Sequence, residues 1–222
     1  MTPTILPPSV PPSSRPVAVT PMPASAPRPV PLTPWRPQPK KWTCKEFHQL
    51  GDMGWFEGKR AILINGEILE MPRPDPPHAT TTSLVVAALR AVFVTGHFVR
   101  GQMPLVLGQS TDPEPDASVI VGSIRDFAKA HPTTAALVLE ISDSTLAFDL
   151  GEKMSLYAAG GIADYWVVDL NNRQLIVHRS PIRDPNQLHG WAYADVTTHT
   201  PGATVSPLAA PTATVAVADL LP

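Results

Sequence analysis

Two carboxylates lie in stretches of sequence that otherwise have the pattern of buried strands. Glu140 stands inside the apolar run of residues 136–141, and Asp116 comes directly before the strand-like segment of residues 117–121. A buried ionised carboxylate without a partner costs several kcal/mol, and two neighbouring carboxylates repel each other unless a cation lies between them. Because Mg²⁺ binds through one or two carboxylates and keeps several waters, neighbouring strands that carry these acids would form a magnesium site.

Each acid also has a purely structural interpretation. Pro115 and Asp116 form a common turn dipeptide, so Asp116 could cap a turn, whereas Glu140 could pair with an arginine. For Asp116 alone the two interpretations stay equally open. A buried strand centre is a poor place for an acid with only a structural role, so the position of Glu140 favours the functional interpretation.

A cation follows at helical spacing. Asp149, Lys153 and Tyr157 are four residues apart and fall on one face of a helix predicted over residues 147–161. Spacing alone favours an exposed ion pair between Asp149 and Lys153, which contributes a few tenths of a kcal/mol. The alternative directs Lys153 at the metal site, where its ammonium would orient a water or neutralise charge that develops on the reacting phosphate.

Turn and cap signals divide the chain around these residues. Thr43 and Glu46 predict a capping box at the start of a short helix. Asn65-Gly66 and Asn171-Asn172 each mark a hairpin between two apolar segments. The hairpins therefore lie before and after the segments that carry the two acids and the lysine.

The elements between these hairpins predict a mixed α/β domain. An amphipathic helix is expected between residues 76 and 96, followed by strands in 97–108, 115–122 and 135–142, the helix with Lys153, and a strand over 163–170. This order predicts an α-β-β-β-α-β core, in which the last strand follows a helical crossover and is parallel to a neighbour. We expect a mixed central sheet flanked by helices, with extra hairpins at the N- and C-terminal sides.

Residues 1–40 differ in composition from the rest of the chain. They contain 14 of the 28 prolines and no Asp or Glu. Because proline fixes φ and lacks a backbone N–H, this segment predicts a polyproline-like, disordered tail, and residues 41–222 are the expected folded domain. A ligand for a proline-recognising module, or a weakly basic arm, is the alternative interpretation of the tail.

Charge and cysteine content limit the class of protein. The chain has a formal net charge of −2, and the four cations of residues 1–40 leave about −6 for residues 41–222. Nucleic-acid binding would therefore depend on a local patch. The single cysteine excludes an internal disulfide, and no signal-peptide pattern or apolar run of about 20 residues is found. We expect a soluble, cytoplasmic protein without a membrane partner.

Four short motifs occur in order within the predicted domain: Pro-Asp at 115–116, Glu-x-Ser-Asp-Ser at 140–144, Asp-x-x-x-Lys-x-x-x-Tyr at 149–157 and Tyr-Trp-x-x-Asp at 165–169. Together with the segment KRAILINGEILEM, they resemble the Uma family of restriction endonuclease-like proteins, within the PD-(D/E)XK nuclease superfamily. The resemblance covers most of residues 41–222. It implies a restriction endonuclease-like fold and a metal-dependent endonuclease that hydrolyses DNA phosphodiester bonds.

The resemblance also implies roles for individual residues. Asp116 and Glu140 become the ligands of Mg²⁺ or Mn²⁺. Lys153 becomes the catalytic lysine, because Ser142 occupies the position two residues after the acid where the superfamily usually has it. DNA is the implied partner, and a homodimer is left open. Three residues are expected to line the cleft: His78, Gln102 and Ser142.

One position departs from the family pattern. Many relatives have an acid where this chain has Ile62, although Glu67 follows in the same hairpin. This departure and the negative net charge favour a rival hypothesis, in which the nuclease fold has lost catalysis and acts as a binding or regulatory module. The complete set of Asp116, Glu140 and Lys153 favours the enzyme.

Overall fold

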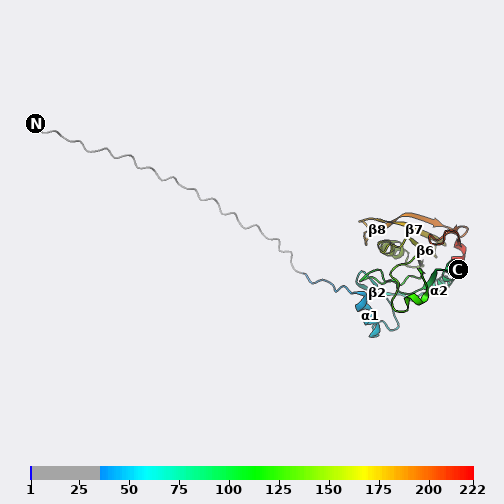
Figure 1. Cartoon of the computed structure of the whole chain (residues 1–222), viewed down its shortest axis with the longest axis horizontal. Coiled ribbons are helices and arrows are strands. Elements are labelled where there is room, and N and C mark those ends of the chain that lie inside the picture. The colour runs from blue at the N-terminus through cyan, green and yellow to red at the C-terminus, as the bar shows by residue number, and fades with distance from the viewer. Residues whose placement is uncertain (2–35) are drawn as a thin grey trace. The chain divides into compact units, whose positions relative to one another are not determined.

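The structure is a computed structural model and describes Met1 and residues 36–222. Residues Pro39–Pro222 form one compact unit, which Figure 1 shows with its helices and strands labelled. The prediction of a polyproline-like tail over residues 1–40 lies largely outside the described residues. The following paragraphs therefore concern the unit that contains the two acids and the lysine.

A six-stranded mixed sheet forms the middle of this unit, with the strand order β3-β4-β5-β6-β7-β8. Within it β5 and β6 are parallel, and the other neighbouring strands are antiparallel. The predicted mixed sheet and its parallel crossover are therefore confirmed. The strands are β3 (His97–Gly101), β4 (Ala117–Val121), β5 (Leu137–Ser142), β6 (Asp164–Asp169), β7 (Gln174–Arg183) and β8 (Trp191–His199).

The N-terminal elements form at the predicted signals. Helix α1 (Cys44–Asp52) begins with the capping box, in which the Thr43 hydroxyl accepts from the Glu46 N–H and the Glu46 carboxylate accepts from the Thr43 N–H. Strands β1 (Arg60–Ile64) and β2 (Glu67–Met71) form a hairpin whose two turn residues have positive φ. Figure 1 shows α1 and β2 at the end of the domain away from β7 and β8.

The β1–β2 hairpin does not extend the central sheet. It is a separate two-stranded sheet, and an antiparallel bridge between Leu63 and Asp112 joins it to the loop before β4. The two backbone bonds of this bridge measure 2.7 and 3.3 Å. The side chain of Leu63 is buried with Cys44 and Phe47 of α1, so the helix and the hairpin share a small core of their own.

Helix α2 (Pro76–Val92) covers one face of the central sheet. Asp75 caps it by accepting from the His78 N–H, and prolines occupy its first turn, where no intrahelical N–H bond is required. Val85 and Leu89 are fully buried in a cluster with strand residues such as Leu139 and Trp166. The short pair β9 (Thr204–Val205) and β10 (Val215–Ala216), with the turn η3 (Val217–Leu220), adds buried residues to the same cluster.

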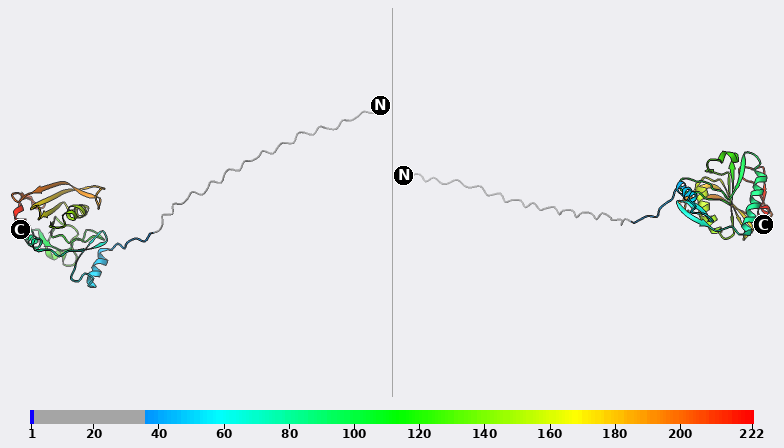
Figure 2. Two further views of the ribbon diagram at one scale, coloured as in Figure 1. Left: turned by 180° about the vertical axis from the view of Figure 1, so that it is seen from behind. Right: turned by 90° about the horizontal axis from the view of Figure 1, so that it is seen from below.

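The opposite face is covered by a helical rod in three parts. These are α3 (Leu146–Phe148), the π-helical segment η2 (Asp149–Lys153) and α4 (Met154–Ala159); a further 3₁₀ turn, η1 (Ile124–Phe127), follows β4. Tyr157 of the rod packs with Val138 and Tyr165 of the sheet. The single regular helix predicted here is therefore interrupted by a π turn, a feature that is frequent at functional sites. Figure 2 gives two further views of the rod, the sheet and α2.

Two predicted elements are shorter than the sequence pattern indicated. Strand β3 ends at Gly101 rather than continuing to residue 108, because Gln102 has a φ of 49° and leaves the extended conformation. Helix α2 ends at Val92 rather than near Gly96, and Phe93 follows it into the buried cluster of that face. In both places the chain leaves the regular element before the next glycine.

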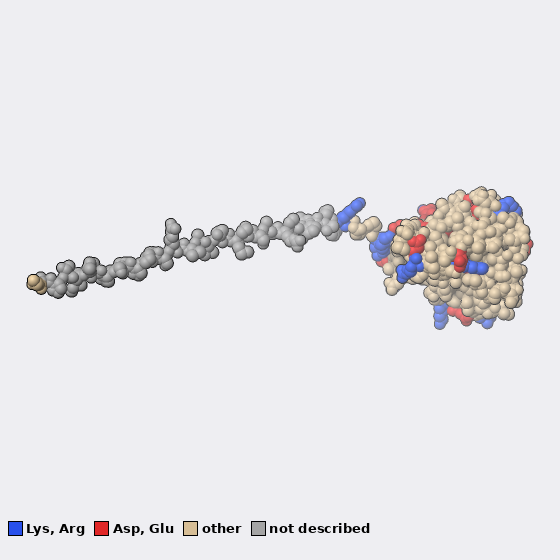
Figure 3. Space-filling view, turned by 90° about the horizontal axis from the view of Figure 1, so that it is seen from above, with Lys and Arg blue, Asp and Glu red and all other residues tan. Residues whose placement is uncertain are grey.

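The surface combines scattered charges with a few exposed apolar side chains. On the face shown in Figure 3, Lys and Arg lie among Asp and Glu and do not gather into a continuous basic area. Trp55 and Met53, in the loop that follows α1, are largely exposed. Among the described residues, no helix has both the length and the apolar character needed to cross a membrane.

The buried carboxylate of Asp164 connects the sheet to the C-terminal segment. Its Oδ1 accepts from Arg179 Nε at 2.8 Å and from Trp166 Nε1 at 2.7 Å, and its Oδ2 accepts from the Leu208 N–H at 2.8 Å. The same guanidinium donates to the Ser206 carbonyl at 2.7 Å. One buried acid therefore holds two strands and the segment leading to β10 together.

Replacing Asp164 by alanine should destabilise the domain by about 3 kcal/mol, because it leaves a half-buried guanidinium and a buried indole N–H without their acceptor. The matched control is Glu70→Ala, which breaks the exposed pair with Lys59 and should cost less than about 1 kcal/mol. Urea unfolding of both variants measures the two losses. Equal losses would show that the Asp164 network contributes no more than a surface ion pair.

Candidate active site

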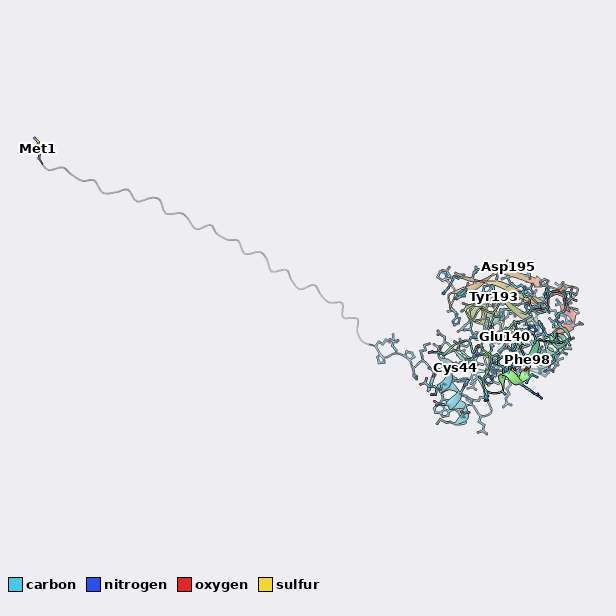
Figure 4. All side chains as sticks on the ribbon, in the orientation of Figure 1. Met1, Cys44, Phe98, Glu140, Tyr193 and Asp195 are labelled. Atoms are coloured by element: carbon cyan, nitrogen blue, oxygen red, sulfur yellow. The ribbon has the colours of Figure 1, made fainter. Side chains whose placement is uncertain are left out.

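The structure places Asp116 and Glu140 next to each other on neighbouring strands. In the antiparallel pair β4–β5 Ala117 lies opposite Leu139, and the same register continued by one residue sets Asp116 opposite Glu140. The Asp116 N–H donates to Glu140 Oε2 at 3.3 Å, and the Ile141 N–H donates to Asp116 Oδ2 at 2.9 Å. The exposed fraction is 5% for Asp116 and 1% for Glu140. Figure 4 marks Glu140 within the domain.

Glu140 is held by two side chains of the helical rod. The Tyr157 hydroxyl donates to its Oε1 at 2.6 Å, and Lys153 Nζ lies 3.0 Å from its Oε2. Burial raises the pKa of Glu140 to about 8, and the charges of Asp116 and Asp149 act in the same direction, whereas Lys153 opposes them. Without a further cation, this carboxyl group therefore holds a proton more readily than an ordinary glutamate.

Lys153 is buried, so the prediction of an exposed ion pair, which the spacing alone favoured, is wrong. Its ammonium lies between Glu140 and Asp149, 3.0 and 3.1 Å from their oxygens, and the residue is 5% exposed. Burial acts to lower the pKa of Lys153, but the nearby carboxylates outweigh it and raise this pKa above its ordinary value. The reason for the burial is the packing of the rod on the sheet, which turns this face of the helix inward.

Asp149 is fixed by hydroxyl groups as well as by the lysine. Ser142 Oγ and Thr145 Oγ1 each donate to its Oδ2 at 2.6 Å. The backbone carbonyl of Asp149 accepts from the Tyr165 hydroxyl at 2.9 Å, within the π-helical segment. Ser142 therefore contacts the acid that holds Lys153 and makes no hydrogen bond to Glu140.

Asp116 is reached from the other side by a histidine and an amide. His78 Nε2 lies 3.2 Å from Asp116 Oδ2, and Gln102 Nε2 donates to Asp116 Oδ1 at 3.2 Å. Burial acts to raise the pKa of Asp116, but the His78 contact and the charge of Lys153 outweigh it and lower this pKa below its ordinary value. In return, the hydrogen bond with Asp116 raises the pKa of His78.

These groups lie along a cavity of about 280 Å³. Asp116, Glu140 and Lys153 form part of its lining, with Ile62 of the β1–β2 hairpin and the first residues of the 143–145 turn nearby. The outer lining carries further charges: Arg60, Arg73, Asp75, Glu114 and Asp143. A contact with Asp75 raises the pKa of Asp143 in this rim. The cavity is therefore bounded by both acids and bases.

The sequence-derived residues are brought together to different degrees. Asp116, Glu140, Lys153 and His78 line the cavity. Gln102 contacts Asp116 and Ser142 contacts Asp149, and neither Gln102 nor Ser142 is part of the lining. Ile62 is nearly buried in the cavity wall, where it supplies no oxygen ligand. Among the described residues, no three His, Cys, Asp or Glu side chains converge as a closed metal site.

Sequence reasoning did not assign the outer residues of the cavity. Arg60 and Arg73 come from the ends of the β1–β2 hairpin, and Glu114 comes from the loop before β4. Arg60 lies 3.7 Å from Glu114. No motif marks these positions, because they meet only after the hairpin packs against the loop. The sequence did indicate Asp149 and Tyr157, because each is four residues from Lys153 on one face of the predicted helix. Both residues contact the Glu140–Lys153 pair in the structure.

Comparison with known proteins shows the family of this chain. The model of the Uma2 family, described as "Putative restriction endonuclease", matches residues 44–218. The chain belongs to the Uma2 family. The resemblance read from the four motifs is therefore confirmed, and the matched range of this Uma2 protein includes every residue of the network described above.

A solved structure has a similar fold. It is the crystal structure of a "putative nuclease belonging to DUF820" from Anabaena variabilis, with a TM-score of 0.61 and 19% sequence identity. The alignment covers 80% of this Uma2 chain and 96% of the other chain. At this identity the likeness concerns the fold. No protein of curated function matches the chain significantly.

The buried Glu140 should make the stability of the metal-free protein fall as pH rises. The folded protein keeps this proton up to about pH 8, whereas a glutamate at its ordinary pKa of 4.5 has lost it, so the folded state binds more protons between these values. Between pH 5 and pH 8 the free energy of unfolding should decrease by up to about 1.4 kcal/mol per pH unit.

Urea unfolding in EDTA at pH 5, 6.5 and 8 measures this dependence. Glu140→Gln is the matched variant, because it keeps the size of the side chain and removes the titration. The slope over this pH range should be much smaller in the variant, and what remains comes from histidines such as His78, whose pKa is also shifted in the folded protein. An unchanged slope in Glu140→Gln would show that other groups cause the pH dependence.

Proposed function

We propose that this protein is a metal-dependent endonuclease that hydrolyses phosphodiester bonds of DNA. The observation that carries the proposal is the meeting of Asp116, Glu140 and Lys153 along one cavity, with both acids buried. The description of the Uma2 family, and the nuclease named in the similar crystal structure, support the same class of reaction.

Asp116 and Glu140 would hold Mg²⁺ or Mn²⁺. Three buried carboxyl groups (with Asp149 the third) face the cations Lys153 and His78, so one negative charge is in excess once Glu140 has lost its proton. Buried excess charge is costly, and hard divalent ions prefer carboxylate oxygens and keep several waters, so two protein acids are enough. When bound, such an ion polarises the scissile phosphate and lowers the pKa of a coordinated water.

Lys153 would act as a preorganised positive charge. Glu140 and Asp149 hold its ammonium from two sides, so its position is fixed before a phosphate enters the cavity. A fixed charge that needs no reorganisation stabilises the transition state most effectively in a site from which water is largely excluded. It would also orient the attacking water towards the phosphorus atom.

Two further contacts would keep these groups in position. The bond from Tyr157 orients the Glu140 carboxylate, so that its other oxygen faces Lys153 and Asp116. His78 lies at the opposite edge of Asp116, at the start of α2, and lines the cavity. These residues would hold the reacting groups in a single arrangement, which a nuclease needs for in-line attack.

A binding or regulatory module without catalysis is the second candidate. It is favoured by Ile62, which fills the cavity wall where many relatives have an acid, and by the charge of about −6 over residues 41–222. The two candidates differ in what Lys153 does. A binding module requires only its charge, whereas an enzyme requires it during turnover.

The wild-type protein should nick supercoiled plasmid with Mg²⁺ or Mn²⁺, and EDTA should abolish this activity. Lys153→Met should lower the rate by about 100-fold or more, the scale for losing one preorganised transition-state contact. Lys59→Met is the matched control, because Lys59 forms an exposed pair and lies outside the cavity lining. Its rate should stay near that of the wild type.

One outcome would contradict the role of Lys153, and another would contradict the enzyme. Full activity of Lys153→Met, with metal dependence retained, would remove the lysine from the mechanism. A wild-type protein that binds DNA without nicking it, under every metal condition, would favour the binding module.

Mn²⁺ should raise the melting temperature of the wild-type protein, because an ion that binds the folded state selectively stabilises it. Glu140→Gln should abolish the shift. The control is Glu114→Gln, which removes a carboxylate from the outer cavity and should keep the shift. Differential scanning fluorimetry over a range of Mn²⁺ concentrations measures all three proteins. Equal shifts in the wild type and Glu140→Gln would place the metal elsewhere.

A further inference from the structure

The acids of the candidate site lie below walls that belong to other parts of the chain. Asp116, Glu140 and Lys153 are each at most 5% exposed. The walls come from the β1–β2 hairpin, from the connection over residues 72–75 and from the turn over residues 143–145. A substrate phosphate must therefore pass between protein segments before it reaches the acids.

We propose that this cavity takes single-stranded DNA, or unpaired nucleotides within a duplex, rather than an intact double helix. The inference rests on the proposed nuclease function and specifies the substrate class of the same site. It is carried by the size of the cavity, by the charges around it and by the side chains at its rim.

The cavity has room for a single nucleotide-sized unit. Its volume of about 280 Å³ is close to the lower limit of roughly 300 Å³ for small-ligand pockets. DNA duplexes are stiff over about 150 base pairs, so a continuous helix cannot bend one phosphodiester alone into such a space. A strand must leave its partner to enter, and this costs least where the nucleotide is already unpaired.

The charges of the domain do not favour a long duplex footprint. Residues 41–222 contain 13 Lys and Arg against 19 Asp and Glu. Five of these cations are already paired with carboxylates: Lys41, Lys59, Arg60, Lys153 and Arg179. The cavity rim itself carries the acids Asp75, Glu114 and Asp143. Proteins that hold a duplex commonly contact about 6–10 phosphates, whereas this rim offers two arginines.

The rim offers the two kinds of contact that a single strand uses. Arg60 and Arg73 line the cavity and suit a phosphate. Arg73 Nη2 donates to the Gly58 carbonyl at 3.3 Å, which connects the rim to the loop after α1. Trp55 in that loop is 64% exposed. An exposed indole three residues along the chain from this contact is a surface on which unpaired bases stack, and the paired bases of a duplex are not accessible to it.

Cleavage of matched oligonucleotides by the full-length protein tests the inference. A labelled 30-nucleotide strand, its blunt duplex and the same duplex with a central single-stranded gap of 6 nucleotides are incubated with Mn²⁺. We expect the single strand to be cut at least about 20-fold faster than the duplex, and the gapped substrate to be cut within its gap.

Each result has a definite meaning. Cleavage of the blunt duplex at a rate within about 3-fold of the single strand would overturn the substrate class and leave the nuclease function standing. Cleavage of none of the three substrates, with none of them bound, would overturn the nuclease function and this inference with it.

Binding in EDTA gives a second, independent measurement. Fluorescence anisotropy should show tighter binding of the single strand than of the duplex. With two or three phosphates contacted, the slope of log K against log salt should be about −2, because each contributes about −0.7 for single strands. A slope steeper than about −5 would indicate a long phosphate footprint and would overturn the inference.

Two variants test where the single strand binds. Trp55→Ala should weaken single-strand binding by about 5-fold or more, the scale for losing one stacked base, and should leave the melting temperature nearly unchanged because the side chain is exposed. Arg73→Gln should weaken binding and lower the salt slope by nearly 1. The control is Arg125→Gln in η1, outside the cavity lining. Unchanged binding in both Trp55→Ala and Arg73→Gln would overturn the assignment of this rim.

Discussion

The ion pair between Glu140 and Lys153 is the interaction on which the site depends. A carboxylate at the centre of a buried strand needs a cation within reach, and the helical rod that follows β5 supplies one only 13 residues later. Because the crossover from β5 to β6 must pass over this face of the sheet, the rod is already in place to bring the lysine to the acid. The other charged groups of the site shift the pKa values of these two residues.

The π-helical turn contains the second buried acid of this network. Asp149 and Lys153 lie at its two ends, are both buried, and have their charged atoms 3.1 Å apart. The hydroxyls of Ser142 and Thr145 then compensate the second buried acid. When Glu140 is ionised, these groups carry an excess of negative charge in the interior, which lowers stability in the absence of a further cation and favours the binding of one.

Much of this arrangement could be predicted from the sequence. The alternation of apolar residues located β5 and made Glu140 conspicuous, and the capping box and the asparagine-glycine turn located α1 and the first hairpin. Local signals of this kind act within a few residues, so they survive in the folded structure. To predict that Asp116 and Glu140 lie opposite each other, one must also know that β4 and β5 are neighbouring strands and how they are paired.

The features that could not be predicted all depend on contacts between distant segments. The spacing of Asp149 and Lys153 is the same on an exposed helix and on a buried one, so only the packing of the rod decides between them. The end of β3 depends on the backbone of Gln102, whose side chain then reaches Asp116. The cavity walls arise where the hairpin meets the loop before β4, and no local pattern encodes that meeting.

The separate sheet formed by β1 and β2 has a consequence for the evolution of such proteins. The acids and the lysine belong to the central sheet and its crossover, whereas the wall above them belongs to a hairpin that forms a sheet of its own and is bonded to the loop before β4. Insertions or exchanges in the hairpin can therefore reshape the entrance while the reacting groups keep their positions. Related proteins could therefore differ in the substrates that they admit and still keep the same acids and lysine.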